Sequence, residues 1–274
     1  MAGLSSVLKS DWQAFCNGNR LNIVLSLASL TSSHPEAAKY SIEITSTVLA
    51  DKNESVFEEP ENFSECVDLL LSFSSAAAGY YSSNSAQING VADGVDAASP
   101  KVRRKALPNQ ESVERAISAL EMLFKLHFII PKLIKRTEIR SERAWFEYWL
   151  PILSGLGQQC YHPSREIRQN AVTHLQRALL LPELEETTLD CSVDCFDNVL
   201  FALLDELLKN EVCKLDPHGM DETRMRACGL LCKIFLHYFD RLTKTKEVTR
   251  IWCRILDFLT KYSNCGGPIL VNYI

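Results

Sequence analysis

Several large classes of protein are excluded by what this sequence lacks. Its apolar runs stay shorter than the about 18 residues that a membrane-spanning helix needs, and one of the most apolar, residues 199–208, contains Asp205 and Glu206. The net charge is −5, from 29 Lys and Arg against 34 Asp and Glu, so the chain is not a strongly basic nucleic-acid binder. Residues 1–8 lack the basic head and apolar core of a signal peptide. We therefore expect a cytoplasmic protein that does not bind nucleic acid.

The motifs of common catalytic and cofactor-binding sites are missing as well. The sequence has no Walker loop, no Gly-x-Ser-x-Gly, no His-Glu-x-x-His and no paired-carboxylate constellation. Gly155 and Gly157 form half of a dinucleotide fingerprint, but they lie in a helical pattern and do not follow a strand. The sequence therefore predicts a protein that is not an enzyme, with no catalytic residue, no metal ion, no cofactor and no small-molecule substrate.

Ten cysteines are present, and their setting favours reduced thiols over disulfides. A disulfide scaffold would be short and loop-rich, which this chain is not. The pairs Cys191/Cys195 and Cys228/Cys232 have a spacing of four, which could place two metal ligands on one helix face, but no second ligand pair completes a set. Buried core thiols are the favoured interpretation, also for the other cysteines that lie inside apolar helical patterns, Cys66 and Cys253.

The spacing of apolar residues indicates helices throughout the chain. In 199–208 and 225–238 the apolar residues cover more than one helical face. Alternating strand patterns are nearly absent, and Asn89-Gly90 lies in a polar stretch without flanking strands. We expect an all-α protein of helix pairs: 11–30 with 36–49, 63–78 with 112–134, the stretch from 145 with 167–180, and 197–210 with 222–238, followed by 249–262.

The turns between paired helices repeat. His34-Pro35 and His162-Pro163 each precede a helix start that contains Glu, and Arg168 and Arg226 stand at matching points of two second helices. Such pairs resemble HEAT or armadillo repeats, and one pair cannot bury its apolar stripe alone, so we expect a HEAT/armadillo-like α-solenoid of stacked antiparallel pairs. Four arginines are expected to brace turns by donating to carbonyls and carboxylates: Arg165, Arg168, Arg224 and Arg226.

Composition divides the chain into four parts. Residues 1–78 are expected to form N-terminal helical repeats, 79–108 a disordered loop rich in Ser, Ala and Gly, and 109–262 a second repeat region. An irregular tail, 263–274, suggests a fragment or a truncated gene product. The basic run 101–105 could be a localisation signal, although a solvated loop end is favoured.

Positive charge gathers in the middle of the sequence, since 101–143 hold 11 Lys and Arg against 5 Asp and Glu. Pro131 is expected to kink or end the long apolar helix 112–134. A basic amphipathic segment of this kind can lie on an anionic membrane or bind a partner. An ordinary helix end with cations near its C-terminus explains the same pattern and is favoured. The candidate surface consists of Lys132, Lys135, Arg136 and Arg140, with Arg143 following.

The stretch 145–262 resembles a known family. The resemblance rests on the segments Trp149-Leu150-Pro151-Ile152-Leu153, Arg168-Gln169-Asn170-Ala171, Leu175 to Leu180, Gly219 to Phe235, and Trp252 with Ile255 to Leu259. Their order is similar to the C-terminal homology-downstream-of-Sec7 (HDS) region of the large Golgi Arf guanine-nucleotide exchange factors, GBF/Gea branch. The last residues, from Gly266-Gly267-Pro268 onward, depart from the helix with which the family would continue.

The resemblance implies a non-catalytic regulatory and membrane-targeting segment of a cytoplasmic, peripheral Golgi membrane protein that acts in ER–Golgi vesicle-mediated transport. Its expected partners are other proteins and the anionic Golgi membrane surface. Exchange in that family is carried out by a separate Sec7 domain, so the resemblance implies contact with the Arf GTPase only through that domain, and no catalytic residue is carried over. The alternative is a generic HEAT-repeat scaffold that binds a protein partner; an enzyme with an unrecognised site is the least favoured.

Overall fold

The computed structural model describes residues 34, 36–49, 57, 60–88, 110–188 and 191–265. The expected helix 11–30, the basic run 101–105 and the last nine residues lie outside this part of the chain. Within it every regular element is helical. The α-helices are α3 (Ala38–Val48), α4 (Pro60–Ile88), α5 (Gln110–Lys125), α6 (Ile130–Thr137), α7 (Ser141–Ala144), α8 (Leu150–Gln159), α9 (Arg165–Ala178), α10 (Pro182–Thr187), α11 (Ser192–Asp194), α12 (Phe201–Leu207), α13 (Asn210–Leu215), α14 (Pro217–Leu242) and α15 (Val248–Cys265).

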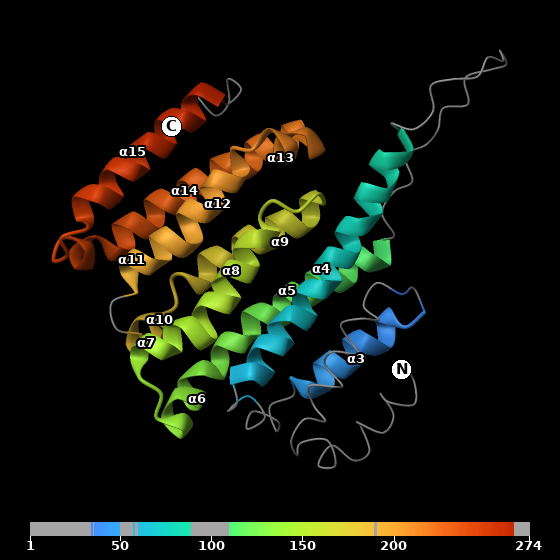
Figure 1. Cartoon of the computed structure of the whole chain (residues 1–274), viewed down its shortest axis with the longest axis horizontal. Coiled ribbons are helices and arrows are strands. Elements are labelled where there is room, and N and C mark those ends of the chain that lie inside the picture. Colours follow the sequence, from blue (N-terminus) through green and yellow to red (C-terminus); the bar gives the residue numbers. More distant parts are fainter. Residues whose placement is uncertain are drawn as a thin grey trace.

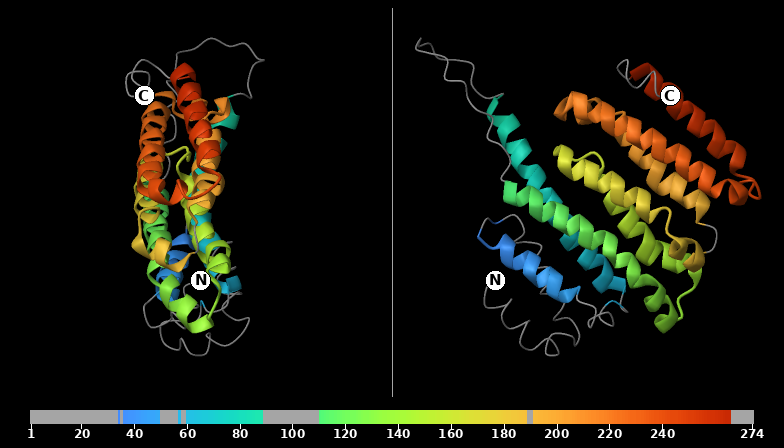
Figure 2. Two further views of the ribbon diagram at one scale, coloured as in Figure 1. Left: turned by 90° about the vertical axis from the view of Figure 1, so that its left-hand side faces the viewer. Right: turned by 180° about the vertical axis from the view of Figure 1, so that it is seen from behind.

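The helices stack in two parallel rows, which Figure 2 shows edge-on. The first row holds α4, α8, α12 and α15, and the second row holds α5, α9 and α14 (Figure 1). Each helix of the second row packs on the helix before it in the chain and on its neighbours in the row. The predicted all-α solenoid of stacked antiparallel pairs is confirmed.

One continuous apolar core runs between the two rows. It contains large side chains from each pair, such as Phe73, Leu123, Leu156, Leu175 and Phe201, all of them buried. Each such side chain contributes about 1.5–3 kcal/mol when it leaves water. Since the core crosses every pair, no pair is an independent folding unit, and stability comes from stacking.

The first described pair joins segments on either side of the sequence predicted to be disordered. Helices α4 and α5 pack along their length, as expected for 63–78 and 112–134. Helix α4 continues to Ile88, so residues 79–88, which were predicted to begin the disordered loop, belong to this helix. Helix α5 ends at Lys125, a 3-10 turn η3 (Leu126–Phe128) follows, and α6 begins one residue before Pro131. The helix predicted over 112–134 therefore ends before Pro131, and the expectation that Pro131 kinks or ends it is wrong. Pro131 instead lies in the first turn of α6, where its missing N–H breaks no intrahelical hydrogen bond.

Two first-row helices begin with a π-helical turn. The turns are η4 (Trp145–Trp149), which precedes α8, and η5 (Cys195–Leu200), which precedes α12. Around η4 buried side chains recur about every fourth residue, at Ala144 and Trp145, Tyr148 and Trp149, and Ile152 and Leu153. A regular α-helix has 3.6 residues per turn and would rotate such a pattern off one face. The wider turn keeps these side chains in the core.

Seven cysteines of the described residues are free thiols, and five of these are buried: Cys66, Cys160, Cys191, Cys195 and Cys228. Burial raises the pKa of Cys66 to about 12, so this thiol stays protonated. Cys232 and Cys253 are exposed, and the prediction that they lie in the core is wrong. Among the described residues no group of three or more His, Cys, Asp or Glu could hold a metal ion. No helix among them is long and apolar enough to cross a membrane.

Candidate functional site

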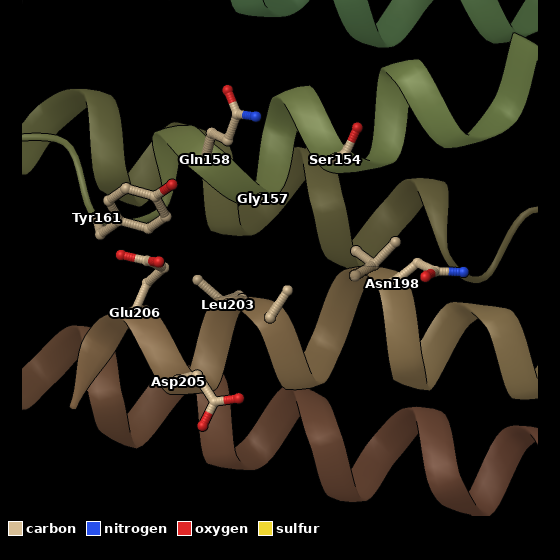
Figure 3. Close-up of a pocket in the computed structure, with 10 residues that line it drawn as sticks. Ser154, Gly157, Gln158, Tyr161, Asn198, Leu203, Asp205 and Glu206 are labelled. Atoms are coloured by element: carbon tan, nitrogen blue, oxygen red, sulfur yellow. The ribbon is translucent and has the colours of Figure 1, made fainter. Parts of the chain in front are cut away.

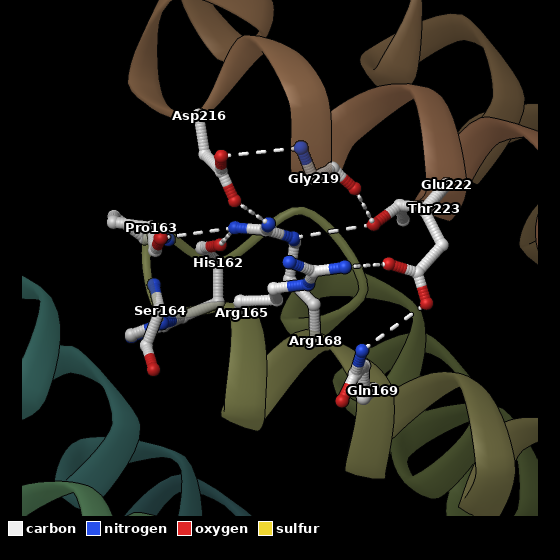
Figure 4. A network of polar contacts seen from close by, with 10 residues as sticks. All are labelled: His162, Pro163, Ser164, Arg165, Arg168, Gln169, Asp216, Gly219, Glu222 and Thr223. Atoms are coloured by element: carbon white, nitrogen blue, oxygen red, sulfur yellow. Dashed lines mark hydrogen bonds and ion pairs between the residues drawn. The ribbon is translucent and has the colours of Figure 1, made fainter.

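A buried arginine joins two successive helix pairs at one edge of the stack, where α9 and α14 begin (Figure 4). Arg168, in the first turn of α9, is fully buried. Its Nη1 donates to the carbonyls of His162 at 2.8 Å and Pro163 at 2.9 Å, its Nη2 to Asp216 Oδ2 at 2.5 Å, and its Nε to Thr223 Oγ1 at 3.2 Å. The guanidinium thus connects the turn after α8 with the start of α14.

The start of α14 is shaped around this contact. Asp216 caps the helix by accepting from the Gly219 amide at 3.1 Å. A Cβ at Gly219 would collide with the Asp216 carboxylate and lie 2.6 Å from Arg168 Nη2, so a side chain has no room there. Burial alone would raise the pKa of Asp216, but the hydrogen bonds from Arg168 and the Gly219 amide outweigh it and hold the pKa below its usual value.

The other three arginines of the candidate set also lie at this junction. Arg165 pairs with Glu222 across α9 and α14, and Arg226 Nη2 donates to Thr173 Oγ1 at 3.2 Å. Arg224 is buried, and its Nε donates to the Leu207 carbonyl at the end of α12, at 2.9 Å. Arg168 therefore bonds carbonyls in the turn after α8, and Arg224 bonds the carbonyl of the last residue of α12. Arg224, and not Arg226 as the sequence suggested, occupies the place that corresponds to Arg168.

A buried histidine ties the same turn to α4. His162 Nδ1 accepts the Ser164 amide at 3.0 Å, so the proton sits on Nε2, which donates to the Ser74 carbonyl at 2.9 Å. Burial lowers the pKa of His162 to about 4, and the ring is neutral at pH 7. Three helix pairs thus meet at this turn.

The predicted basic surface lies at the opposite edge of the stack, at the other ends of the helices (Figure 1). Lys132, Lys135 and Arg136 are exposed on α6, and Arg140 is exposed just before α7. Two aromatic side chains project from flanking turns, since Phe128 is 61% exposed and Phe146 is 59% exposed. Phe128 belongs to the apolar stretch 112–134 that the sequence analysis identified. Nothing in the sequence marked Phe146, because its exposure depends on the π turn η4.

A surface groove, which the sequence did not indicate, lies between α8 and α12 (Figure 3). Its volume is about 390 Å³. It is lined on one side by Gln158 and Tyr161 and on the other by Asn198, Asp205 and Glu206. The lining residues include no histidine or cysteine. The groove therefore offers polar and acidic contacts.

Comparison with known proteins finds a match within the second half of the chain. Residues 149–272 match the GBF1-like, tetratrico peptide repeat region. The match covers α8 to α15 and includes the Arg168 junction. The residues that match this region are thus part of the stacked helices described above.

Three curated relatives carry names of exchange factors. The Golgi-specific brefeldin A-resistance guanine nucleotide exchange factor 1 homolog of Caenorhabditis elegans is 32% identical over 126 residues, which is 45% of this chain and 6% of the relative. The ARF guanine-nucleotide exchange factor GNOM of Arabidopsis thaliana is 25% identical over 248 residues, 87% of this chain and 15% of the relative. GNL1 of the same plant, also an ARF guanine-nucleotide exchange factor, is 25% identical over 242 residues, 87% of this chain and 15% of the relative. This chain is therefore similar to one region of large ARF exchange factors and spans a small fraction of their length.

Proposed function

We propose that this chain is a non-catalytic, regulatory and membrane-targeting helical-repeat region of a large Arf guanine-nucleotide exchange factor of the GBF/Gea branch. In this proposal it corresponds to the HDS region and acts in ER–Golgi vesicle-mediated transport, on the cytoplasmic face of Golgi membranes. The observation that carries the proposal is the match of residues 149–272 to the GBF1-like repeat region. The names of the three relatives support the exchange-factor context.

Membrane targeting is assigned to the basic surface formed by Lys132, Lys135, Arg136 and Arg140. A cation near an anionic bilayer contributes about 1 kcal/mol of attraction. The exposed rings of Phe128 and Phe146 add apolar contact of the kind that enters the headgroup boundary. Anionic lipid is therefore the proposed partner of this basic surface, and other proteins are proposed to bind elsewhere on the solenoid.

Vesicle flotation tests the membrane assignment. The chain is mixed with vesicles of phosphatidylcholine alone or with phosphatidylserine added, and the variant Lys132→Gln/Lys135→Gln/Arg136→Gln is run beside it. We expect flotation only with phosphatidylserine, and its loss in the variant. The matched control neutralises three exposed lysines that lie outside the basic surface, on α14 and in the turn after it: Lys233, Lys244 and Lys246. No flotation, or equal flotation of both variants and the parent, contradicts the assignment.

A nucleotide-release assay tests the non-catalytic part. Arf loaded with a fluorescent guanine nucleotide should release it at the same rate with and without this chain. Any acceleration by the chain alone would overturn the proposal.

A generic helical-repeat scaffold that binds a protein partner is the second candidate. The groove between α8 and α12 favours it, since Gln158, Tyr161 and Glu206 present donors and acceptors along an open surface. Two results together would support the scaffold over the membrane segment: the chain does not float with any vesicle, and it binds a protein partner that the Tyr161→Ala variant no longer binds.

A further inference from the structure

The groove between α8 and α12 combines apolar and polar lining residues (Figure 3). Val199 and Leu203 belong to the core and expose only a small part of their surface, which lies in the groove. Gln158 and Asn198 are exposed on opposite walls. The volume of about 390 Å³ lies at the lower end of the range of ligand pockets, so the groove has room for a few side chains of a partner.

A tyrosine and a glutamate face one another across the groove (Figure 3). Tyr161 follows α8 and is half-buried, and Glu206, in the last turn of α12, keeps 34% of its side chain in water. Burial raises the pKa of Tyr161 and the charge of Glu206 raises it further, so the phenol is neutral at pH 7. A ring beside a carboxylate suits a guanidinium, because the ring face attracts a cation and the carboxylate accepts its N–H groups.

The lining residues carry charge of one sign. Asp205 and Glu206 are acidic, and none of the residues that line the groove is Lys, Arg or His. Glu206 pairs with Lys209 at 2.6 Å, but Lys209 does not line the groove and 53% of its side chain is exposed. Exposed ion pairs of this kind are weak. A cation that enters the groove can therefore replace Lys209 as the partner of Glu206.

The next junction of the same row contains an arginine in a comparable setting. Arg254 of α15 lies over the Phe201 ring of α12, with its Cζ 4.4 Å from the ring centroid. Its Nη2 lies 3.5 Å from Asp205 Oδ2. An arginine thus fills the space between a ring and a carboxylate where α12 meets α15. Where α8 meets α12, Tyr161 and Glu206 supply the ring and the carboxylate, and no lining residue supplies the arginine.

We propose that the groove between α8 and α12 binds an arginine side chain of a protein partner, with the guanidinium stacked on Tyr161 and paired with Glu206. The amide groups of Gln158 and Asn198 bond the backbone on either side of this arginine. Arginine is favoured over lysine because its planar group stacks on a ring and reaches both carboxylate oxygens. The inference rests on the proposed binding of other proteins by the solenoid, and it involves no residue of the basic surface.

A peptide titration followed by NMR of the full chain, labelled with ¹⁵N, tests the proposal. The probe is acetyl-Leu-Ala-Arg-Leu-amide. The same peptide with citrulline in place of arginine is the control ligand, because citrulline keeps the shape of the side chain and carries no charge. The arginine peptide should shift the side-chain amide signals of Gln158 and Asn198 and bind about tenfold more tightly than the citrulline peptide.

Variants of the groove provide the second part of the test. Glu206→Gln and Tyr161→Ala should each weaken binding of the arginine peptide about tenfold, whereas Tyr161→Phe keeps the ring and should not. Lys209→Gln should tighten binding, because Glu206 loses its competing partner. Asp257→Asn is the matched control, since Asp257 pairs with Lys261 on α15 at 2.6 Å and does not line the groove. This variant should bind the peptide as the parent does.

Several outcomes would overturn the proposal. They are the absence of binding, shifts that avoid Gln158 and Asn198, equal affinity for the arginine peptide and its citrulline or lysine counterpart, and unchanged affinity in Glu206→Gln and Tyr161→Ala. Flotation of Glu206→Gln with phosphatidylserine vesicles separates this inference from the proposed function. If the variant and the parent float equally but the parent binds no peptide, only the groove assignment is refuted. If the parent binds the peptide but does not float, only the membrane assignment is refuted.

Discussion

Replacing Arg168 by Met is the most direct test of how the repeats are held together. Met approximates the length of the arginine stem and removes the guanidinium. The substitution leaves two carbonyls without their donor and Asp216 without its cation. Removing one partner of a buried ion pair costs about 3–5 kcal/mol. Asp216 keeps 32% of its side chain in water, so we expect a loss near the lower end, about 3 kcal/mol.

The loss should also change the shape of the unfolding curve. Arg168 is bonded to the turn after α8 and to the start of α14, so its removal weakens the interface between two pairs more than either pair itself. Stability in stacked repeats is a sum of unit and interface terms, and a weakened interface lowers cooperativity. We therefore expect a broader urea transition, or two transitions, followed by far-UV circular dichroism.

Two controls accompany the measurement. Arg165→Met removes an exposed partner of Glu222 and should leave the transition nearly unchanged. Arg168→Lys keeps the charge but not the planar set of donors, and should lie between the parent and Arg168→Met. If Arg165→Met and Arg168→Met lose equal stability, or if the transition keeps its slope, the reasoning about the junction is refuted.

Three further predictions concern the same junction. Gly219→Ala should destabilise the chain in thermal melts, because its Cβ would displace the Asp216 carboxylate, and a melt equal to the parent would contradict this. In the parent, the free energy of unfolding should fall by roughly 3 kcal/mol between pH 6.5 and 4, because the unfolded chain takes up a proton at His162 at a higher pH than the folded chain does. His162→Gln should remove this part of the pH dependence. Asp216→Asn should reduce the loss of stability below about pH 4. In the parent, the lowered pKa of Asp216 stabilises the fold, and this stabilisation is lost as the carboxyl becomes protonated. Urea titrations across pH check the last two, and unchanged slopes would contradict them.

The helix pairs could be predicted from the sequence because their apolar spacing is strong and their turns carry proline. The pairing of α4 with α5 across a long polar stretch followed from the need of each to bury its stripe. Cys232 could not be placed correctly, because apolar residues cover more than one face of 225–238 and the pattern does not show which face is exposed. The pattern alone does not say where the described stack ends.

The junction was only partly predictable. The spacing of the arginines indicated turn contacts for Arg168, but nothing in the sequence marked Asp216 as its partner 48 positions away. The burial of Gly219 between that carboxylate and the guanidinium explains why a glycine stands one turn inside a helix. The groove between α8 and α12 also depends on how rows pack, which local patterns do not contain.

The π turns η4 and η5 stand at equivalent places before α8 and α12, so the buried residues of the two segments correspond position by position. At a constant offset of 51 positions, seven buried residues of 144–156 coincide with seven of 195–207: Ala144 with Cys195, Trp145 with Phe196, Tyr148 with Val199, Trp149 with Leu200, Ile152 with Leu203, Leu153 with Leu204, and Leu156 with Leu207. The second-row arginines Arg168 and Arg224 are instead offset by 56, and the longer connection through α13 accounts for the difference. The two segments are therefore equivalent modules, and a chimera that carries 144–156 in place of 195–207 would present apolar side chains at each of the same core positions.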